Sequence, residues 1–414
     1  MGFGQGLSGL NAASQNLDVI GNNIANSSTV GYKSSNIQFA DVYASSRVGL
    51  GVSVAGVNQR FTIGTVSITG NQFDMAIDGE KGLFRLMDQS GAVVYSRNGQ
   101  FSPDKNLFLT NSQGHRLTGY LPGSTDPQPI RIPTGNIAPK ATSEMSLRAN
   151  LDSNAKVVPA GTKVDPANPD TYTSSFPYNV YDSLGNAHQV TQYFIKREAV
   201  NGESVWDVQY FMNGKVLGTP DPNSADPDNP DIIPTTNTLT FNKAGELVSP
   251  TGAVTLSLAV EGGNSPAENL DINLSYAGST QLGGPFAATP DQDGYKMGEY
   301  ASMSIAADGS IVANYTNGQT QTMGTLVLAD FYNMQGLQPL GGNVWAETAT
   351  SGQPILGRPG ENGMAVVRGQ SVEESNVDMG QELVNMIIAQ RTYQANAQTI
   401  KTQDQVLQTL ITMR

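Results

Sequence analysis

The chain has no cysteine among its 414 residues, which excludes disulfide bonds, thiolate chemistry and cysteine-ligated zinc. Charged residues make up only 14%, against about 25% in a typical globular protein. The formal net charge of −13 argues against nucleic acid as a partner, because phosphate binding needs a basic face. No run of about 18 apolar residues occurs, and no basic segment precedes an apolar stretch at the start. We therefore expect neither membrane insertion nor general secretory export.

The residues that most enzymes need are scarce as well. Only two histidines occur, His115 and His188, and each lies beside a turn, which favours an exposed structural role. The stretch 4–9 fits G-x-G-x-x-G, but it lacks a preceding strand and indicates flexibility before a helix. The acidic segment 221–231 lacks the glycine and glutamate of a calcium loop, and the Glu373–Glu374 pair is typical of surface charge. We expect no catalytic, metal or cofactor site.

What the sequence does contain is helical periodicity at both ends. Near the start, apolar residues recur at spacings of three and four, which predicts a helix from Leu7 to Ile24. Asn26 to Ser28 would end it, and Gly31 would follow as a turn residue. The stripe comprises Leu7, Leu10, Ala13, Leu17, Ile20 and Ile24.

The C-terminal periodicity is longer. Asp378 is a candidate N-cap with Gln381 as its capping partner, and the helix would run from Met379 to Ile411, about 50 Å. Apolar residues recur every seven positions from Met386 to Leu407 and would form a seam along the helix. Gln390 and Asp404 interrupt this seam, so the heptad pattern is imperfect. The apolar positions that we assign to assembly are Leu383, Met386, Tyr393, Ile400, Leu407 and Ile411, with Ala397 also in the seam.

The region between these helices is β-like. Turn signals at 88–91, 182–185, 242–245 and 308–309 separate short segments of alternating or apolar residues. We therefore predict a multidomain fold, with an α-helical, coiled-coil-like terminal domain formed by both chain ends and mainly-β domains of sandwich or barrel type. The two helical stripes could pack on the protein's own core. The length and heptad phase of the C-terminal helix favour packing between copies instead.

Two terminal motifs carry a resemblance. The N-terminal motif lies in 17–33 and the C-terminal motif begins at Ser375 and continues through 382–402. Their most distinctive residues are Ala25, Asn26, Thr29, Gly31, Tyr32, Lys33, Ser375, Asn376, Val377 and Asp378. Together they resemble the axial proteins of the bacterial flagellum, a family of rod, hook and junction subunits. The segments 294–296, 314–315 and 343–346 are most similar to those of hook subunits.

The resemblance implies four parts. Residues 1–30 and 372–414 would form a terminal-helix polymerisation domain. Residues 31–71 and 360–371 would connect it to an inner β domain made of 72–145 and 296–359. An outer β domain, 146–295, would be inserted in the inner one.

The same resemblance implies a function. The chain would be a structural subunit of the flagellar hook, a homopolymer of many copies that forms a curved, flexible tube outside the cell. Expected partners are the distal rod protein, the hook cap, the hook–filament junction protein and the flagellar type III export apparatus. The alternatives are a distal rod protein, which would lack the long inserted middle, and an unrelated exported fibre or adhesin subunit.

Overall fold

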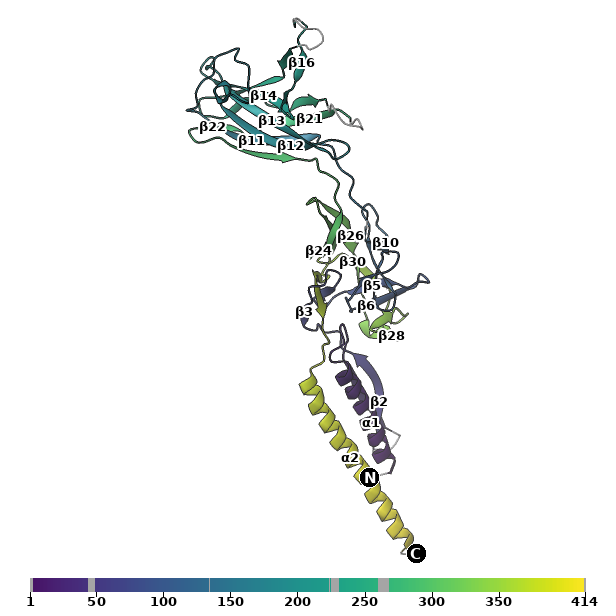
Figure 1. The fold of residues 1–414 in the computed structure, drawn as a ribbon. Coiled ribbons are helices and arrows are strands. Elements are labelled where there is room, and N and C mark those ends of the chain that lie inside the picture. Colours follow the sequence, from purple (N-terminus) through teal and green to yellow (C-terminus); the bar gives the residue numbers. More distant parts are fainter. Residues whose placement is uncertain are drawn as a thin grey trace. The chain divides into compact units, whose positions relative to one another are not determined.

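The structure is a computed structural model that describes residues 3–43, 49–133, 135–222, 224, 231–259 and 268–412 (Figure 1). The chain forms two compact units. The first comprises residues 1–134, 300–315 and 319–414, and the second comprises 135–299 and 316–318. Most of the acidic segment 221–231 lies outside the described residues, so the expectation that it is not a calcium loop stays a prediction.

Two helices of the first unit lie side by side. Helix α1 spans Phe3–Ala25 and α2 spans Met379–Thr412. Both predicted helices are confirmed, but α1 begins before Leu7, so the glycines of 4–9 lie inside the helix rather than in a flexible lead. The start of α1 packs on the middle of α2 and its end on the start of α2, so the pair is antiparallel.

The start of α2 is capped as its sequence predicts, with one difference. The Asp378 carboxylate accepts from the backbone N–H groups of Gly380 at 2.9 Å and Gln381 at 3.1 Å. The Gln381 side chain, however, donates to Asn385 at 3.1 Å and does not complete the expected capping box. Asp378 therefore satisfies two N–H groups that have no partner within the helix.

A long β-hairpin lies against α1. Strands β1 (Ser35–Tyr43) and β2 (Gly49–Gln59) pair antiparallel, and both contact α1. Gln5 donates from its side chain to the Gly49 carbonyl at 2.6 Å, and the Ser8 hydroxyl accepts from the Val52 N–H at 3.3 Å. The predicted connecting region thus contains a regular element, and α1 is covered by the hairpin as well as by α2.

The remainder of the first unit is β structure around two apolar clusters. Its largest sheet has 13 strands, and two further pairs, β3–β32 and β4–β31, join residues far apart in sequence. The core includes Phe84, Leu86, Ile311 and Leu328, all fully buried. The strands are β3 (Val66–Ile68), β4 (Met75–Asp78), β5 (Leu83–Met87), β6 (Val93–Ser96), β7 (Ser102–Pro103), β8 (Leu109–Thr110), β9 (Arg116–Tyr120), β10 (Pro127–Pro129), β24 (Tyr300–Ile305), β25 (Ser310–Tyr315), β26 (Thr320–Leu326), β27 (Leu328–Asp330), β28 (Gln338–Gly341), β29 (Val344–Ala346), β30 (Ile355–Gly357), β31 (Val366–Gly369) and β32 (Ser371–Glu373), with a short 3-10 turn at Met334–Gly336.

The second unit contains a five-stranded and a six-stranded sheet that contribute to one core, as in a sandwich. Leu147, Trp206 and Leu258 are fully buried in it. The first sheet has β11 (Glu144–Asp152), β20 (Val254–Leu258), β21 (Leu270–Ser275), β22 (Thr280–Leu282) and β23 (Ala287–Gln292). The second has β12 (Ser174–Tyr181), β13 (Ala187–Lys196), β14 (Ser204–Met212), β15 (Lys215–Val216), β18 (Thr236–Phe241) and β19 (Leu247–Ser249), and β16 (Gly218–Pro220) pairs with β17 (Ile232–Pro234), while Pro169–Thr171 forms a 3-10 turn.

All four predicted turns join consecutive strands. In each, the first Asp or Asn accepts from a backbone N–H two residues on, as at Asp88 and Asn242. The following glycine has a positive φ, for example +85° at Gly185 and +76° at Gly309, which a side chain would strain. These turns were predictable because their chemistry is local.

The turn at Asp182 predicts a pH dependence. His188 was expected to be exposed, but its side chain is mostly buried. Its Nε2 atom lies 3.0 Å from the Asp182 carboxylate. Burial raises the pKa of Asp182, but hydrogen bonds from His188, Asn186 and Leu184 outweigh it and hold the pKa at about 2. A depressed carboxyl pKa stabilises the fold above the ordinary value of 3.8 and loses that contribution as the pH falls toward 2.

As the pH falls from 5 to 2, the free energy of unfolding of the second unit should decrease. We expect this decrease to be smaller by about 2 kcal/mol in Asp182→Asn than in the parent. Urea unfolding at a series of pH values measures this. Asp165→Asn, at an exposed carboxylate of the same unit, is the control. Equal decreases in Asp182→Asn and the parent would contradict the prediction.

Candidate functional site

The helix pair is packed through small residues of α1. Gly6, Ala12 and Ala13 are buried, and a Cβ added at Gly6 would lie 3.1 Å from Ile400. One added at Gly9 would lie 2.9 Å from the Asn396 side chain. The glycines therefore permit a close approach of the two helices. Of the predicted stripe, Ile20 is buried, Leu10, Leu17 and Ile24 are half-buried, and Leu7 is exposed.

The predicted seam of α2 is only partly turned toward α1. Met386 and Ile400 are half-buried, whereas Leu383, Tyr393, Leu407 and Ile411 are exposed. Among the residues of α2 whose burial is described, Ala389 is buried, and sequence reasoning did not select it. The assembly role of the predicted residues stays a prediction, and within one chain most of them have surface that packing on α1 does not cover.

A row of apolar side chains on α2 is open to solvent. Met379, Leu383, Val384, Ile387 and Ile388 are each more than 40% exposed. Met379, Leu383 and Ile387 follow one another at intervals of four residues, as do Val384 and Ile388, so the five side chains lie on two adjoining faces of the helix. An apolar surface of this kind is typical of a site that another protein surface covers.

A groove runs between α2 and the hairpin, with α1 as its floor. At one end it is polar, lined by Asn23, Arg60, Glu382 and Asn385. At the other end it is apolar and has a volume of about 420 Å³. The apolar end is lined chiefly by Gly9, Ala12, Ala13, Phe39, Val52 and Ile388.

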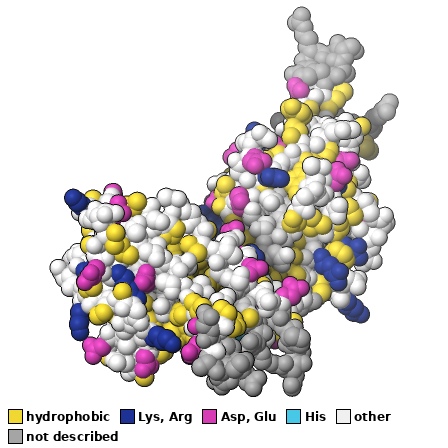
Figure 2. All heavy atoms as spheres, turned by 90° about the horizontal axis from the view of Figure 1, so that it is seen from above, with side chains coloured by type: hydrophobic (Ala, Val, Ile, Leu, Met, Phe, Trp, Pro, Cys, Tyr) yellow, Lys and Arg dark blue, Asp and Glu magenta, His cyan; other side chains and the backbone are white. Residues whose placement is uncertain are grey.

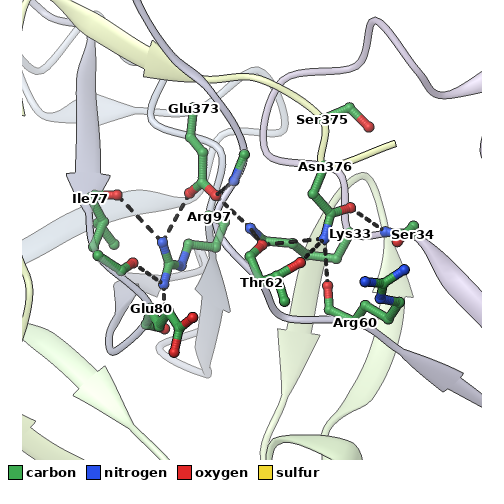
Figure 3. A network of polar contacts seen from close by, with 12 residues as sticks. Lys33, Ser34, Arg60, Thr62, Ile77, Glu80, Arg97, Glu373, Ser375 and Asn376 are labelled. Carbon is green, nitrogen blue, oxygen red and sulfur yellow. Dashed lines mark hydrogen bonds and ion pairs between the residues drawn. The ribbon is translucent and has the colours of Figure 1, made fainter. Parts of the chain in front are cut away.

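A buried ionic cluster lies where the two chain ends meet the β structure (Figure 3). The Glu373 carboxylate is fully buried, 2.5 Å from Lys33 Nζ and 2.9 Å from Arg97 Nη1. It also accepts from the Gly64 N–H at 2.9 Å. The expectation that Glu373 is surface charge is therefore wrong. Its neighbour Glu374, which follows the end of β32, is exposed.

The two cations of the cluster are held by backbone carbonyls. Lys33 Nζ donates to the Thr62 carbonyl at 2.7 Å, and Arg97 Nη2 donates to the carbonyls of Gly79 and Glu80 (Figure 3). Burial lowers the pKa of Lys33, the Glu373 carboxylate opposes this shift, and the Arg97 guanidinium adds to it. The cluster thus joins residue 33 of the N-terminal motif, strand β32 beside the C-terminal motif, and the loop after β4.

Two asparagines complete this junction. Asn376 accepts from the Ser34 N–H at 2.7 Å and donates to the Arg60 carbonyl at 2.7 Å. Asn23, which is buried in α1, accepts from the Ser35 N–H and the Tyr32 hydroxyl and donates to the Ser35 carbonyl. Each amide uses both its donor and acceptor groups on the backbone, so neither aspartate nor alanine reproduces its contacts.

The other motif residues have local roles. Asn26 donates to the Asn22 carbonyl after α1, and Thr29 donates to the Asn26 side chain. Ser375 accepts from the Val377 N–H just before the Asp378 cap. Ala25 is exposed. Sequence reasoning missed Glu373 and Arg97, and it did not single out Asn23 within the motif of 17–33. Glu373 adjoins a motif, but no local signal marks Arg97 as buried.

Gly31 offers a sharp test of this junction. Its φ is +72°, and an added Cβ would lie 2.5 Å from the Asn98 nitrogen. Gly70 has nearly the same φ, +74°, but nothing lies within 4 Å of its Cβ position. Both alanine variants carry the left-handed strain of about 1–2 kcal/mol. We expect Gly31→Ala to lose a further 1–3 kcal/mol, roughly, from overpacking. Urea unfolding of the two variants measures the difference, and equal losses would count against a tight junction.

The described residues lack two kinds of site, a cluster of metal ligands and a membrane-spanning helix. In the part of the chain that the structure describes, no group of three or more His, Asp or Glu side chains could hold a metal ion. Neither helix, over the described residues, combines the length and hydropathy of a membrane span. On the face shown in Figure 2, charged side chains of both signs are scattered among uncharged ones.

Comparisons with known proteins agree along the whole chain. It is 45% identical to the flagellar hook protein FlgE of Escherichia coli over 424 aligned residues, covering all of both chains. It is 44% identical to FlgE of Salmonella typhimurium, again over both full lengths, and 29% identical to that of Borreliella burgdorferi over 99% of this chain and 98% of the relative. The chain belongs to the flagellar hook protein family.

Four segments of the chain match models of flagellar protein families. Residues 5–33 match "Flagella basal body rod protein", 76–150 the "Flagellar hook protein FlgE/F/G D1 domain", 150–295 the "Flagellar basal body protein FlaE D2 domain", and 368–413 the "Flagellar basal body rod FlgEFG protein C-terminal". The crystal structure of the Helicobacter pylori flagellar hook protein FlgE2 covers 74% of this chain and all of its own, with a TM-score of 0.55 and 15% identity. That likeness supports the mainly-β multidomain fold. The resemblance expected from the terminal motifs is thereby confirmed.

Proposed function

We propose that this hook-family chain is a non-enzymatic subunit that polymerises through its terminal helices into a curved, flexible tube, which transmits motor torque to the filament. The observation that carries the proposal is the apolar row on α2, which one chain leaves exposed. A soluble monomer gains little from such a surface, whereas a polymer can bury it in every copy.

The predicted four-part division supports a radial arrangement. In this arrangement the terminal helices line a central channel, the inner β domain surrounds them, and the domain at 146–295 lies outermost. The low charge content favours it, because contacts between uncharged polar groups can exchange at small cost as the tube bends. Expected partners remain the distal rod protein, the hook cap, the junction protein and the type III export apparatus, and the tube would lie outside the cell.

Two alternatives are less well supported. A distal rod protein would lack the D2 segment that matches at 150–295. An unrelated adhesin would not share 45% identity with a hook protein over its full length. The direct experiment is electron microscopy of the polymer formed by the purified chain. A curved tube supports the proposal, and a straight rod or the absence of polymer contradicts it.

Removing the outer domain is expected to change the curvature of the tube and not its existence. The two connections to this domain run side by side, since Lys140 and Tyr295 exchange backbone hydrogen bonds of 3.0 Å. Replacing residues 141–294 by a short Gly/Ser linker therefore leaves both flanks close together. We expect straighter, thinner tubes by electron microscopy and reduced motility. A folded variant that is exported without forming polymer, or tubes of unchanged curvature, would contradict this.

A further inference from the structure

Helix α2 is too long for its partner in the same chain. It has 34 residues, whereas α1 has 23. Because Gly6 faces Ile400 and the helices are antiparallel, the residues after about 404 extend beyond the start of α1 (Figure 1). Three apolar side chains on this extension are exposed, Val406 by 51%, Leu407 by 47% and Ile411 by 75%. We call 404–411 the overhang.

The apolar end of the groove has the complementary shape. Its floor is made of Gly9, Ala12 and Ala13, which leave depth because their side chains are small. Phe39 and Ile388 stand at its sides and are 46% and 58% exposed. The groove is thus an apolar slot whose sides come from the hairpin and from α2.

The overhang cannot fill the groove of its own chain. Helix α2 is continuous from Met379, and no glycine or proline follows Gly380 that would allow a sharp bend. A second copy in the same orientation, displaced along the helix axis, could place its overhang there. In that orientation Asp404, one turn before Leu407, points toward the polar end of the groove, where Arg60 lies. Apolar side chains then meet the apolar end, and Asp404 meets a polar end that carries the Arg60 cation as well as the Glu382 carboxylate.

We propose that the overhang of α2 in one copy docks in the groove between the hairpin and α2 of a neighbouring copy. This inference rests on the proposed polymerisation. It identifies the two surfaces that form one of the contacts between subunits. Leu407 and Ile411 enter the apolar end, and Asp404 faces Arg60. The contact joins the tail of one subunit to the groove of the next, so it is a head-to-tail contact that propagates along a polymer.

Cysteine cross-linking tests the proposal without background, because the chain has no cysteine of its own. Chains carrying Val52→Cys and chains carrying Leu407→Cys are co-assembled, oxidised and separated on a non-reducing gel. Disulfides form only when the Cβ atoms approach to about 4 Å. In the polymer, we expect the pair Val52→Cys and Leu407→Cys to give at least ten times as much cross-linked dimer as the control pair Val52→Cys and Gln394→Cys. Phe39→Cys with Ile411→Cys provides a second pair, in case one variant assembles poorly.

The outcomes separate this inference from the proposed function. Normal tubes in which neither pair cross-links above the Gln394→Cys control would overturn the docking site and leave the polymer intact. Cross-linking within single chains that carry both cysteines, in dilute monomer, would also overturn it. Failure of the parent chain to form any tube would contradict the proposed function itself.

Discussion

Glu373→Ala is expected to lower the free energy of unfolding of the first unit by about 3–5 kcal/mol, because it leaves Lys33 and Arg97 buried without their shared carboxylate. Lys33, Arg97 and Glu373 have side chains that are at most 1% exposed, so water cannot replace the lost partner. The same change also removes the acceptor of the Gly64 N–H.

The measurement is urea unfolding monitored by hydrogen exchange, which reports the stability of each unit separately. The second unit, which contributes no residue to the cluster, should be unchanged. Glu374→Ala is a matched control, since it removes the exposed carboxylate one residue along the chain and should cost less than about 0.5 kcal/mol. If both variants unfold alike, the cluster does not hold the junction.

Leu407→Glu is expected to abolish polymerisation while leaving the folded chain intact. Leu407 is exposed in one chain, so its replacement disturbs no described core. In the polymer it would place a carboxylate in a dry helix contact, which costs several kcal/mol. A loss of about 3 kcal/mol at each contact raises the critical concentration by roughly a hundredfold.

Sedimentation and electron microscopy measure polymer, and circular dichroism checks the fold. Gln405→Glu adds the same charge at an exposed position two residues before Leu407, on a face of the helix turned away from Leu407 and Ile411, and should still polymerise. Normal tubes from Leu407→Glu would show that neither the predicted seam nor the overhang carries assembly. Loss of polymer in both variants would point to net charge instead.

The sequence by itself determined the local features of this protein. Helical spacing located both terminal helices, Asp378 marked the start of α2, and the Asx–glycine turns located four hairpins, because each depends on residues within a few positions of one another. The terminal motifs were enough to indicate the family, which full-length identity confirmed.

Only the tertiary structure decided which of these residues meet. The heptad row predicted an assembly seam through Met386 and Tyr393, which stays a prediction. Within the chain, the glycines of α1 approach Asn396 and Ile400, and Ala389 is buried. Glu373 looked like surface charge, and its burial depends on Lys33 and Arg97, which lie 340 and 276 residues away in sequence. A charge is buried only where opposite charges surround it, and that condition is set by chain segments that local patterns do not connect.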